Sequence, residues 1–206
     1  MMLVKKYFPD ITAQQEAQFA ALFELYADWN NKINLISRKD MANLYEKHIL
    51  HSLGIAEIIR FRAGSRIWDV GTGGGFPGIP LAILFPEVHF VLIDSVGKKI
   101  RTTEIIAREA GLKNVVCIHE RAEDEKQTFD FVVSRAVMPL SDLVKITRKN
   151  ICREQKNALP NGFLCLKGGD LQEELQTFRH KAIEYALSDY FGEEFFKTKK
   201  VIYLPV

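Results

Sequence analysis

The chain has 206 residues, of which 47% are hydrophobic and 26% are charged, and its formal net charge at pH 7 is +2. This composition is typical of a globular protein that can bury a sizeable core, and it excludes a disordered, collagenous or fibrous chain. The nearly neutral balance gives no argument of its own for nucleic-acid binding, which usually goes with a strongly basic surface.

The sequence favours a cytoplasmic protein. No apolar run approaches the roughly 18 residues of a membrane span. The first ten residues contain neither a long apolar segment nor a small-residue cleavage site, which argues against export. The three cysteines, Cys117, Cys152 and Cys165, are unclustered. We therefore expect reduced thiols rather than a disulfide framework or a metal site.

The first sixty residues have helical patterns. Apolar residues at helical spacing predict a helix from Thr12 to Trp29 with Thr12 as its N-cap, and a second helix from about Met41 to Ile59. The segment between them is rich in asparagine, which favours turns and caps. We expect residues 1–60 to form a helical N-terminal extension to a domain over residues 61–206.

From residue 61 onward, short apolar runs alternate with helical patterns. The predicted strands are Arg66–Val70, His89–Asp94, Val115–Ile118, Phe131–Val133 and Gly162–Leu166. Helices are predicted over Lys98–Ala110, ended by Gly111, and over Glu173–Leu187, while Val201–Leu204 is predicted as a final strand at the sheet edge. Such alternation indicates an α/β fold with a mostly parallel sheet and helices on both faces.

A glycine-rich loop, Asp69-Val70-Gly71-Thr72-Gly73-Gly74-Gly75-Phe76-Pro77-Gly78, follows the first predicted strand and opens a helix. Glycine permits sharp turns and lets a ligand lie against main-chain amides without interference from a Cβ atom. Pro77 and Pro80 fit the first helical turn, where N–H groups have no intrahelical partner. Five glycines in eight residues exceed the need of a turn without a ligand, so the loop predicts a binding site.

Several ligands are compatible with a loop of this kind. A dinucleotide pattern that starts at Gly71 would require glycine where Phe76 stands, and no P-loop Lys-Ser/Thr follows. Asp94 lies 23 residues after Gly71, where a carboxylate can accept hydrogen bonds from ribose hydroxyls. NAD and S-adenosylmethionine (SAM) share that ribose. Asp69 before the loop favours SAM, because a sulfonium or ammonium group prefers a nearby carboxylate and a pyrophosphate does not.

Two further segments end at the same predicted sheet edge. The acidic stretch Glu120–Asp124 follows the third strand, and a carboxylate there can accept a hydrogen bond from an adenine amino group. Arg135 follows the fourth strand, at the carboxyl edge where ligands of open α/β sheets bind. Its position fits an active-site cation and a surface ion pair equally well.

These segments together resemble the glucose-inhibited division protein B family over about Trp29 to Gly168. The matching stretches are Trp29-Asn30-x-Lys32-x-Asn34-Leu35, His48-Ile49-Leu50-x-Ser52, the loop from Asp69 to Pro80, Asp94-Ser95-x-x-Lys98-Lys99, Arg121-Ala122-Glu123, Ser134-Arg135-Ala136 and Leu166-Lys167-Gly168. The resemblance implies a Rossmann-like, class I SAM-dependent methyltransferase that acts on N7 of a single guanine in bacterial 16S ribosomal RNA.

The resemblance also implies roles for individual residues. The SAM site would be lined by Gly71, Gly73, Phe76, Ala122, Glu123 and Arg135, with Asp94 on the ribose. Arg135 would in addition orient the target base or contact a phosphate. The sequence departs from the family at His51, where an aspartate is usual, and at Ile36, where a threonine is usual.

Guanine N7 carries an exposed lone pair, so methylation there needs no general base, and catalysis would come mainly from alignment. We accordingly expect His48 and His51 to be packing or surface residues. The basic segments Lys98–Arg101 and Lys145–Lys156 are candidates for contact with RNA phosphates, either in naked ribosomal RNA or in an assembling subunit. Trp29, Tyr26 and Phe76 are aromatic surfaces, for the first two of which core packing is the favoured interpretation.

Other functions remain compatible with the residues. A SAM-dependent methyltransferase acting on a small molecule or a protein fits the near-neutral charge. A nicotinamide-dependent oxidoreductase is disfavoured by Phe76, and a non-catalytic RNA-binding module would show no methyl transfer.

Overall fold

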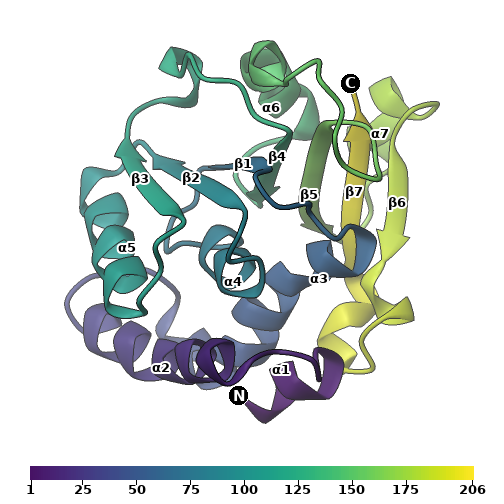
Figure 1. The fold of residues 1–206 in the computed structure, drawn as a ribbon. Helices are drawn as coiled ribbons and strands as arrows, with labels where there is room; N and C mark the ends of the chain where they lie inside the picture. Colours follow the sequence, from purple (N-terminus) through teal and green to yellow (C-terminus); the bar gives the residue numbers. More distant parts are fainter.

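Seven strands form one sheet in the computed structural model, which describes residues 1–37 and 39–206 (Figure 1). The strands are β1 (Arg66–Val70), β2 (His89–Asp94), β3 (Val115–His119), β4 (Phe131–Arg135), β5 (Gly162–Gly168), β6 (Ile183–Ala186) and β7 (Lys199–Pro205). Their order is β3-β2-β1-β4-β5-β7-β6, and the first five are parallel. The predicted α/β fold with a mostly parallel sheet is confirmed.

The central strands are short apolar runs because both of their faces are buried. Along β1, Ile67 belongs to one hydrophobic core, whereas Trp68 and Val70 belong to the core on the opposite face. Trp68 lies beside Val91 of β2 and Val132 of β4, which also contribute to that second core. Alternation along the strands therefore supplies two apolar layers, one for each side of the sheet.

Helices cover both faces. The α-helices are α1 (Met2–Tyr7), α2 (Ala13–Asn30), α3 (His51–Ile58), α4 (Gly78–Leu84), α5 (Gly97–Glu109), α6 (Leu140–Thr147) and α7 (Gln172–Leu175). The 3₁₀ and π-helical segments are η1 (Arg38–Asn43), η2 (Leu44–Leu50), η3 (Ala122–Asp124), η4 (Arg148–Asn150), η5 (Gln176–Phe178), η6 (Leu187–Asp189) and η7 (Glu194–Thr198). Buried side chains of α1 to α5 join one core, and those of α6 and α7 join the other. The sheet thus lies between two helical layers. The carboxyl ends of its parallel strands lie along one edge of the sheet.

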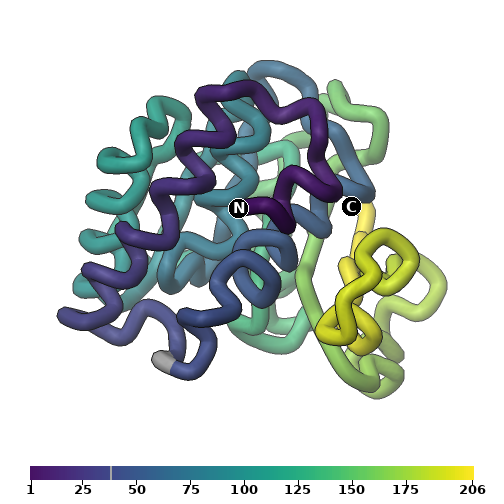
Figure 2. The backbone as a smooth tube through the Cα atoms, turned by 90° about the horizontal axis from the view of Figure 1, so that it is seen from below, coloured from purple at the N-terminus to yellow at the C-terminus, as the bar shows by residue number. Residues whose placement is uncertain are grey.

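The predicted N-terminal helices are present. Thr12 caps α2 through a capping box with Gln15, as the sequence predicted for the helix start. The predicted helix over Met41–Ile59 is helical throughout most of its length, but it consists of the 3₁₀ turn η1, the π-helix η2 and α3. Figure 2 shows the N-terminal helices, purple and blue, lying across the front of the molecule, with the yellow C-terminal segment beside the blue part. Because these helices share the core of the sheet, the division at residue 60 stays a prediction.

Two predictions near the C-terminus were wrong. The helix predicted over Glu173–Leu187 ends early, because α7 and η5 stop at Phe178 and Ile183–Ala186 form strand β6. The predicted edge strand over Val201–Leu204 is part of β7, which lies inside the sheet between β5 and β6 and runs antiparallel to both. Pairing with β7 outweighs the weak local helical preference of the β6 residues.

Within the described part of the chain, no helix has both the length and the apolarity that a membrane crossing requires.

Candidate active site

The glycine-rich loop has a backbone that requires glycine. Gly71, Gly73 and Gly75 have φ values of 67°, 57° and 91°, in the left-handed region that other residues rarely adopt. A Cβ on Gly71 or Gly75 would also collide with a neighbouring side chain, whereas a Cβ on Gly73 would meet nothing within 4 Å. The loop therefore presents open space beside Gly73, at the carboxyl end of β1.

Asp69 fixes the conformation of this loop through hydrogen bonds. Its Oδ2 accepts hydrogen bonds from Thr72 Oγ1 at 2.6 Å and from the main-chain N–H of Gly78 at 2.8 Å. The side chain is fully buried, and burial raises the pKa of Asp69 to about 7. Asp69 thus shapes the loop, and it does not line the adjacent cleft, contrary to the sequence argument that placed it near a ligand's positive charge.

Asp94 joins the loop to the end of β2. One carboxylate oxygen accepts from the N–H of Gly73 at 2.8 Å, and the other accepts from the N–H of Val96 at 2.7 Å. The side chain is half-buried and lines the cleft. Each oxygen keeps a lone pair for a further donor, such as a ribose hydroxyl.

A cleft of about 240 Å³, the acidic cleft, opens at the carboxyl ends of β1, β2 and β3. It is lined by Val70, Gly71, Ile93, Asp94, Ser95, Glu120, Arg121, Ala122, Glu123, Val137, Met138 and Ile146. Three carboxylates face one arginine, and the other walls are largely apolar. The open space at Gly73, the free lone pairs of Asp94 and the acidic rim fit a nucleoside that carries a positive charge.

Arg135 stands at the end of β4 without a carboxylate partner. Its guanidinium forms no ion pair with any described residue. Its Nη2 lies 3.0 Å from His48 Nδ1, its Nη1 lies 3.4 Å from the carbonyl oxygen of Lys47, and its Cζ lies 4.9 Å from the centre of the Phe76 ring. Burial lowers the pKa of Arg135 to about 10, so the group remains a cation at neutral pH.

A second cleft of about 430 Å³, the basic cleft, has Arg135 in its wall. It is lined by Asp40, Lys47, His48, His51, Arg135, Ala136, Leu166, Lys167, Gly168, Leu171, Glu174, Phe195 and Lys199. Four cations face two carboxylates, to which Lys167 and Lys47 are paired at 2.7 and 3.3 Å. Lys199 instead lies over the ring of Phe195 at 4.9 Å. The basic cleft therefore offers positive charge beside an apolar wall.

The two histidines of this cleft are neutral. Burial, reinforced by the charge of Arg135, lowers the pKa of His48 to about 4 and that of His51 to about 3. His51 packs edge-on against Phe195 and Phe196, and its buried Nε2 has no hydrogen-bond partner among the described residues. Neither ring is a cation at neutral pH, in line with the prediction that both are packing or surface residues.

The predicted site residues do not all reach one cavity. Gly71, Asp94, Ala122 and Glu123 line the acidic cleft, and Gly73 is bonded to Asp94 beside it. Phe76 is 2% exposed and lies beneath Arg135, which lines the basic cleft. The predicted set is therefore divided between the acidic cleft and the basic cleft.

Aromatic residues pack beneath Arg135. Phe76 stacks on Tyr26 with ring centres 4.9 Å apart, and the Tyr26 hydroxyl donates to the carbonyl oxygen of Gly74 at 2.6 Å. Tyr26 is fully buried, so core packing is its role. Trp29 is half-exposed, and Lys32 Nζ lies 4.4 Å from the centre of its ring.

Sequence reasoning missed the side chains that meet from distant segments. Lys199 reaches the basic cleft because β7 pairs antiparallel with β5, a pairing that an edge strand over Val201–Leu204 did not suggest. Lys47 precedes His48 on η2, and no sequence motif distinguishes it from other lysines. Val137 and Ile146 complete the acidic cleft, and their apolar character was the available signal.

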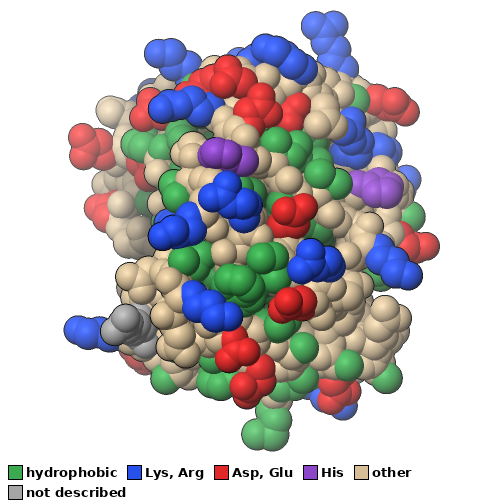
Figure 3. Space-filling model, turned by 90° about the vertical axis from the view of Figure 1, so that its left-hand side faces the viewer, with side chains coloured by type: hydrophobic (Ala, Val, Ile, Leu, Met, Phe, Trp, Pro, Cys, Tyr) green, Lys and Arg blue, Asp and Glu red, His purple; other side chains and the backbone are tan. Residues whose placement is uncertain are grey.

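The predicted basic segment Lys98–Arg101 lies on α5. Figure 3 shows the side of the molecule that bears α5 and β3, where basic and acidic side chains are interspersed. No described group of three or more His, Cys, Asp or Glu is arranged to hold a metal ion.

Comparison with known proteins decides the family. A family model described as rRNA small subunit methyltransferase G (GidB) matches residues 15–202 of the chain. A protein named ribosomal RNA small subunit methyltransferase G from Bacteroides fragilis is 66% identical over 206 residues, covering 100% of both chains. The chain belongs to the GidB family. This confirms the resemblance that its motifs indicated.

Other GidB relatives and solved structures agree. The protein of the same name from Bacteroides thetaiotaomicron is 63% identical over 206 residues and covers 100% of both chains. A SAM-dependent methyltransferase from Aquifex aeolicus has a TM-score of 0.56 at 14% identity, covering 83% of this chain and 100% of that chain. The predicted class I methyltransferase fold is confirmed, and the GidB chain is a methyltransferase.

Proposed function

We propose that the chain transfers a methyl group from SAM to N7 of a single guanine in small-subunit ribosomal RNA. The observation that carries this proposal is a pair of clefts of opposite charge on neighbouring residues, because Val137 lines the acidic cleft and Ala136 lines the basic cleft that also contains Arg135. An acidic cleft suits a sulfonium cofactor, and a basic cleft suits a polyanionic substrate.

The acidic cleft is the proposed site of SAM. Asp94 would accept from the ribose hydroxyls, Glu123 from the adenine amino group, and the glycine loop would face the rest of the molecule. Apolar side chains on both sides of the cleft, such as Ile93 and Val137, would pack on the adenine ring. When bound, SAM supplies a methyl group on a positively charged sulfur.

The basic cleft is the proposed site of the RNA. Lys199 and Arg135, which have no carboxylate partner among the described residues, are free to contact phosphate or base oxygens. Arg135 would donate either to O6 of the target guanine or to a phosphate, and thereby fix the base beside the acidic cleft. Positioning of this kind can supply most of the rate of a transfer that needs no proton removal.

Guanine N7 accepts a methyl group without a general base. Its lone pair forms the new N–C bond while the S–C bonding pair stays on sulfur, so no proton moves. His48 and His51 have pKa values of about 4 and 3, too low for general bases at neutral pH, and their neutral rings serve to pack and accept.

The substrate context is part of the proposal. Residues 1–60 would belong to the working site, because Lys47, His48 and His51 come from this extension to the methyltransferase domain over residues 61–206. We further propose that the guanine is presented within an assembled or assembling ribosomal subunit in the cytoplasm. A folded RNA surface would give the basic cleft several phosphates at once.

The test uses methyl-labelled SAM and small ribosomal subunits from cells that lack this enzyme. We expect label at one guanine, located by strand cleavage at N7-methylguanine. A Gly73→Asp variant should lose SAM binding and transfer, because its side chain would enter the open space of the acidic cleft. Gly64→Asp is the matched control, since Gly64 has φ 74° and equally open surroundings away from the clefts. SAM binding without RNA methylation would contradict the proposed substrate.

A further inference from the structure

Among the described residues, the groups that hold the guanidinium of Arg135 are neutral. Its guanidinium contacts are the Nδ1 atom of His48, the carbonyl oxygen of Lys47 and the face of Phe76. A carboxylate in their place would neutralise the cation and weaken its attraction to an anionic ligand. Neutral acceptors fix the direction of the guanidinium and leave its full charge available to the basic cleft.

The His48 contact is the shortest of the hydrogen bonds to Arg135. Arginine can only donate, so Nδ1 of His48 must be the unprotonated nitrogen and Nε2 must carry the hydrogen. The ring of His48 also lies against Phe76, with ring centres 5.1 Å apart at 52°. His48 and Arg135 thus rest on the same aromatic side chain, which fixes both rings and the guanidinium relative to one another.

The support for this pair reaches the glycine-rich loop. Phe76 is stacked on Tyr26, whose hydroxyl donates to the carbonyl oxygen of Gly74. His48 itself lies on the π-helix η2, a wide turn that is frequent at functional sites. His48 lines the basic cleft and not the acidic cleft, so replacing it would free the guanidinium and change no residue that lines the acidic cleft.

We infer that His48 is a positioning residue, which accepts a hydrogen bond from Arg135 and aims its unpaired guanidinium into the basic cleft for contact with the RNA. This inference rests on the proposed function for the identity of the ligand. It rests on the geometry alone for the coupling between His48 and Arg135.

The test compares two variants of nearly equal shape. His48→Asn places an amide oxygen near the position of Nδ1, and His48→Leu places a methyl group there. The first readout is nitrogen-15 NMR of the free protein, with the Arg135 signal assigned by its loss in Arg135→Lys. We expect slow rotation about the Nε–Cζ bond of Arg135 in wild type and in His48→Asn. In His48→Leu we expect rotation about tenfold faster, the equivalent of one lost hydrogen bond.

The second readout is methyl transfer to small ribosomal subunits. We expect His48→Leu to lose about tenfold in kcat/KM for the subunit, with affinity for S-adenosylhomocysteine within about twofold of wild type. We expect His48→Asn to recover most of that loss. His89→Leu, an exposed histidine at the start of β2, is the control for loss of an imidazole elsewhere.

Two results would overturn the inference. One is an Arg135 rotation rate in folded His48→Leu equal to that of wild type, and the other is a His48→Asn variant as impaired as His48→Leu. Failure of the wild-type protein to methylate any subunit would instead overturn the proposed function, and the NMR comparison would still decide the role of His48.

Discussion

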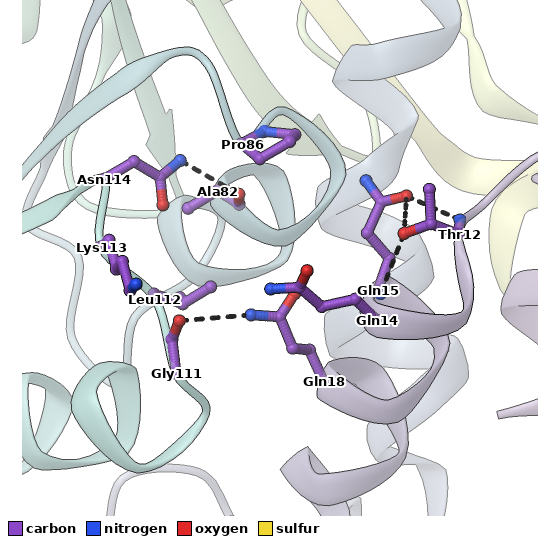
Figure 4. Close-up of a pocket in the computed structure, with 10 residues that line it drawn as sticks. All are labelled: Thr12, Gln14, Gln15, Gln18, Ala82, Pro86, Gly111, Leu112, Lys113 and Asn114. Carbon is purple, nitrogen blue, oxygen red and sulfur yellow. Dashed lines mark hydrogen bonds between the residues drawn. The ribbon is translucent and has the colours of Figure 1, made fainter.

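Two ends of the same sheet contain crevices of opposite character. The crevice at the amino ends of β2 and β3 has a volume of about 390 Å³, larger than the acidic cleft at about 240 Å³. Figure 4 shows two of its polar side chains, Asn114 and Gln18, hydrogen-bonded to the protein's own main chain. Gln15 and Gln18 of α2 donate to main-chain carbonyl oxygens, and Asn114 donates to three of them at 2.9–3.1 Å.

The clefts at the carboxyl ends have polar groups that the protein does not use up. Arg135 lacks a carboxylate among the described residues, Asp94 keeps free lone pairs, and Nε2 of His51 is buried without a partner. Ala136 between the clefts has φ 52°, an unusual value for a residue other than glycine. Size therefore does not identify the working site. Unused hydrogen-bonding capacity and strained backbone do.

The largest expected effect is loss of activity at the carboxyl end. Arg135→Met keeps the length of the side chain and removes its charge and donors. We expect kcat/KM for small ribosomal subunits to fall by about 100-fold, because one oriented charged donor is lost. Lys113→Met removes a cation from the amino-end crevice and should leave kcat/KM unchanged. Equal losses in both variants would erase the proposed difference between the two ends.

A large loss of stability without loss of activity is expected at the amino end. Asn114→Ala removes an amide whose two N–H groups serve the carbonyl oxygens of Ala82, Phe85 and Val88, and at about 1 kcal/mol for each N–H we expect about 2 kcal/mol less stability. Urea unfolding measures this change, and transfer at a temperature where both proteins are folded should be equal. A folded Asn114→Ala protein with wild-type stability but little activity would reverse the assignment.

The pH dependence of stability should distinguish the loop at the carboxyl end. The pKa of Asp69 is about 7 in the folded protein, above its ordinary value of 3.8, because the carboxyl group is buried. The folded state therefore binds a proton on Asp69 more tightly than the unfolded state does. The stabilisation that this proton provides is lost as pH rises toward 7. We expect wild type to lose about 2 kcal/mol more than Asp69→Asn between about pH 5 and pH 7 in denaturant titrations. Parallel curves would show that burial does not raise this pKa.

The smallest expected effect sharpens the structural role of the amino-end crevice. Thr12→Ala breaks the capping box of α2 and should cost about 1 kcal/mol, with no change in methyl transfer. Gln14→Ala, at an exposed neighbour that also lines the crevice, should change the free energy of unfolding by less than about 0.5 kcal/mol. A larger effect at Gln14 than at Thr12 would show that the capping box is not what Thr12 contributes.

The sequence predicted features that depend on near neighbours in the chain. Strands β1 to β5, the capped helix α2 and the glycine loop follow from periodicity and turn residues within a few positions. The acids at the ends of β2 and β3 meet Gly71 because parallel strands bring their carboxyl ends to one edge. These rules gave the acidic cleft except for its Val137 and Ile146 wall.

The remaining features depend on contacts between distant segments. Whether Asp69 points into the cleft or beneath the loop is decided by its bonds to Thr72 and Gly78, which spacing does not reveal. The basic cleft joins Lys47 of η2 to Lys199 of β7, 152 residues apart in the chain. Their meeting depends on the antiparallel placement of β7, which local propensity did not indicate.

The central claim is that the two clefts bind different molecules, and paired binding measurements test it most directly. Calorimetry measures the binding of S-adenosylhomocysteine to Gly73→Asp and to Lys199→Glu. Filter binding measures the binding of small ribosomal subunits to the same two variants. We predict that Gly73→Asp loses the nucleoside and keeps the subunit. Lys199→Glu should keep the nucleoside and bind the subunit more weakly, with a shallower salt dependence. Loss of both ligands in either folded variant would contradict two separate sites.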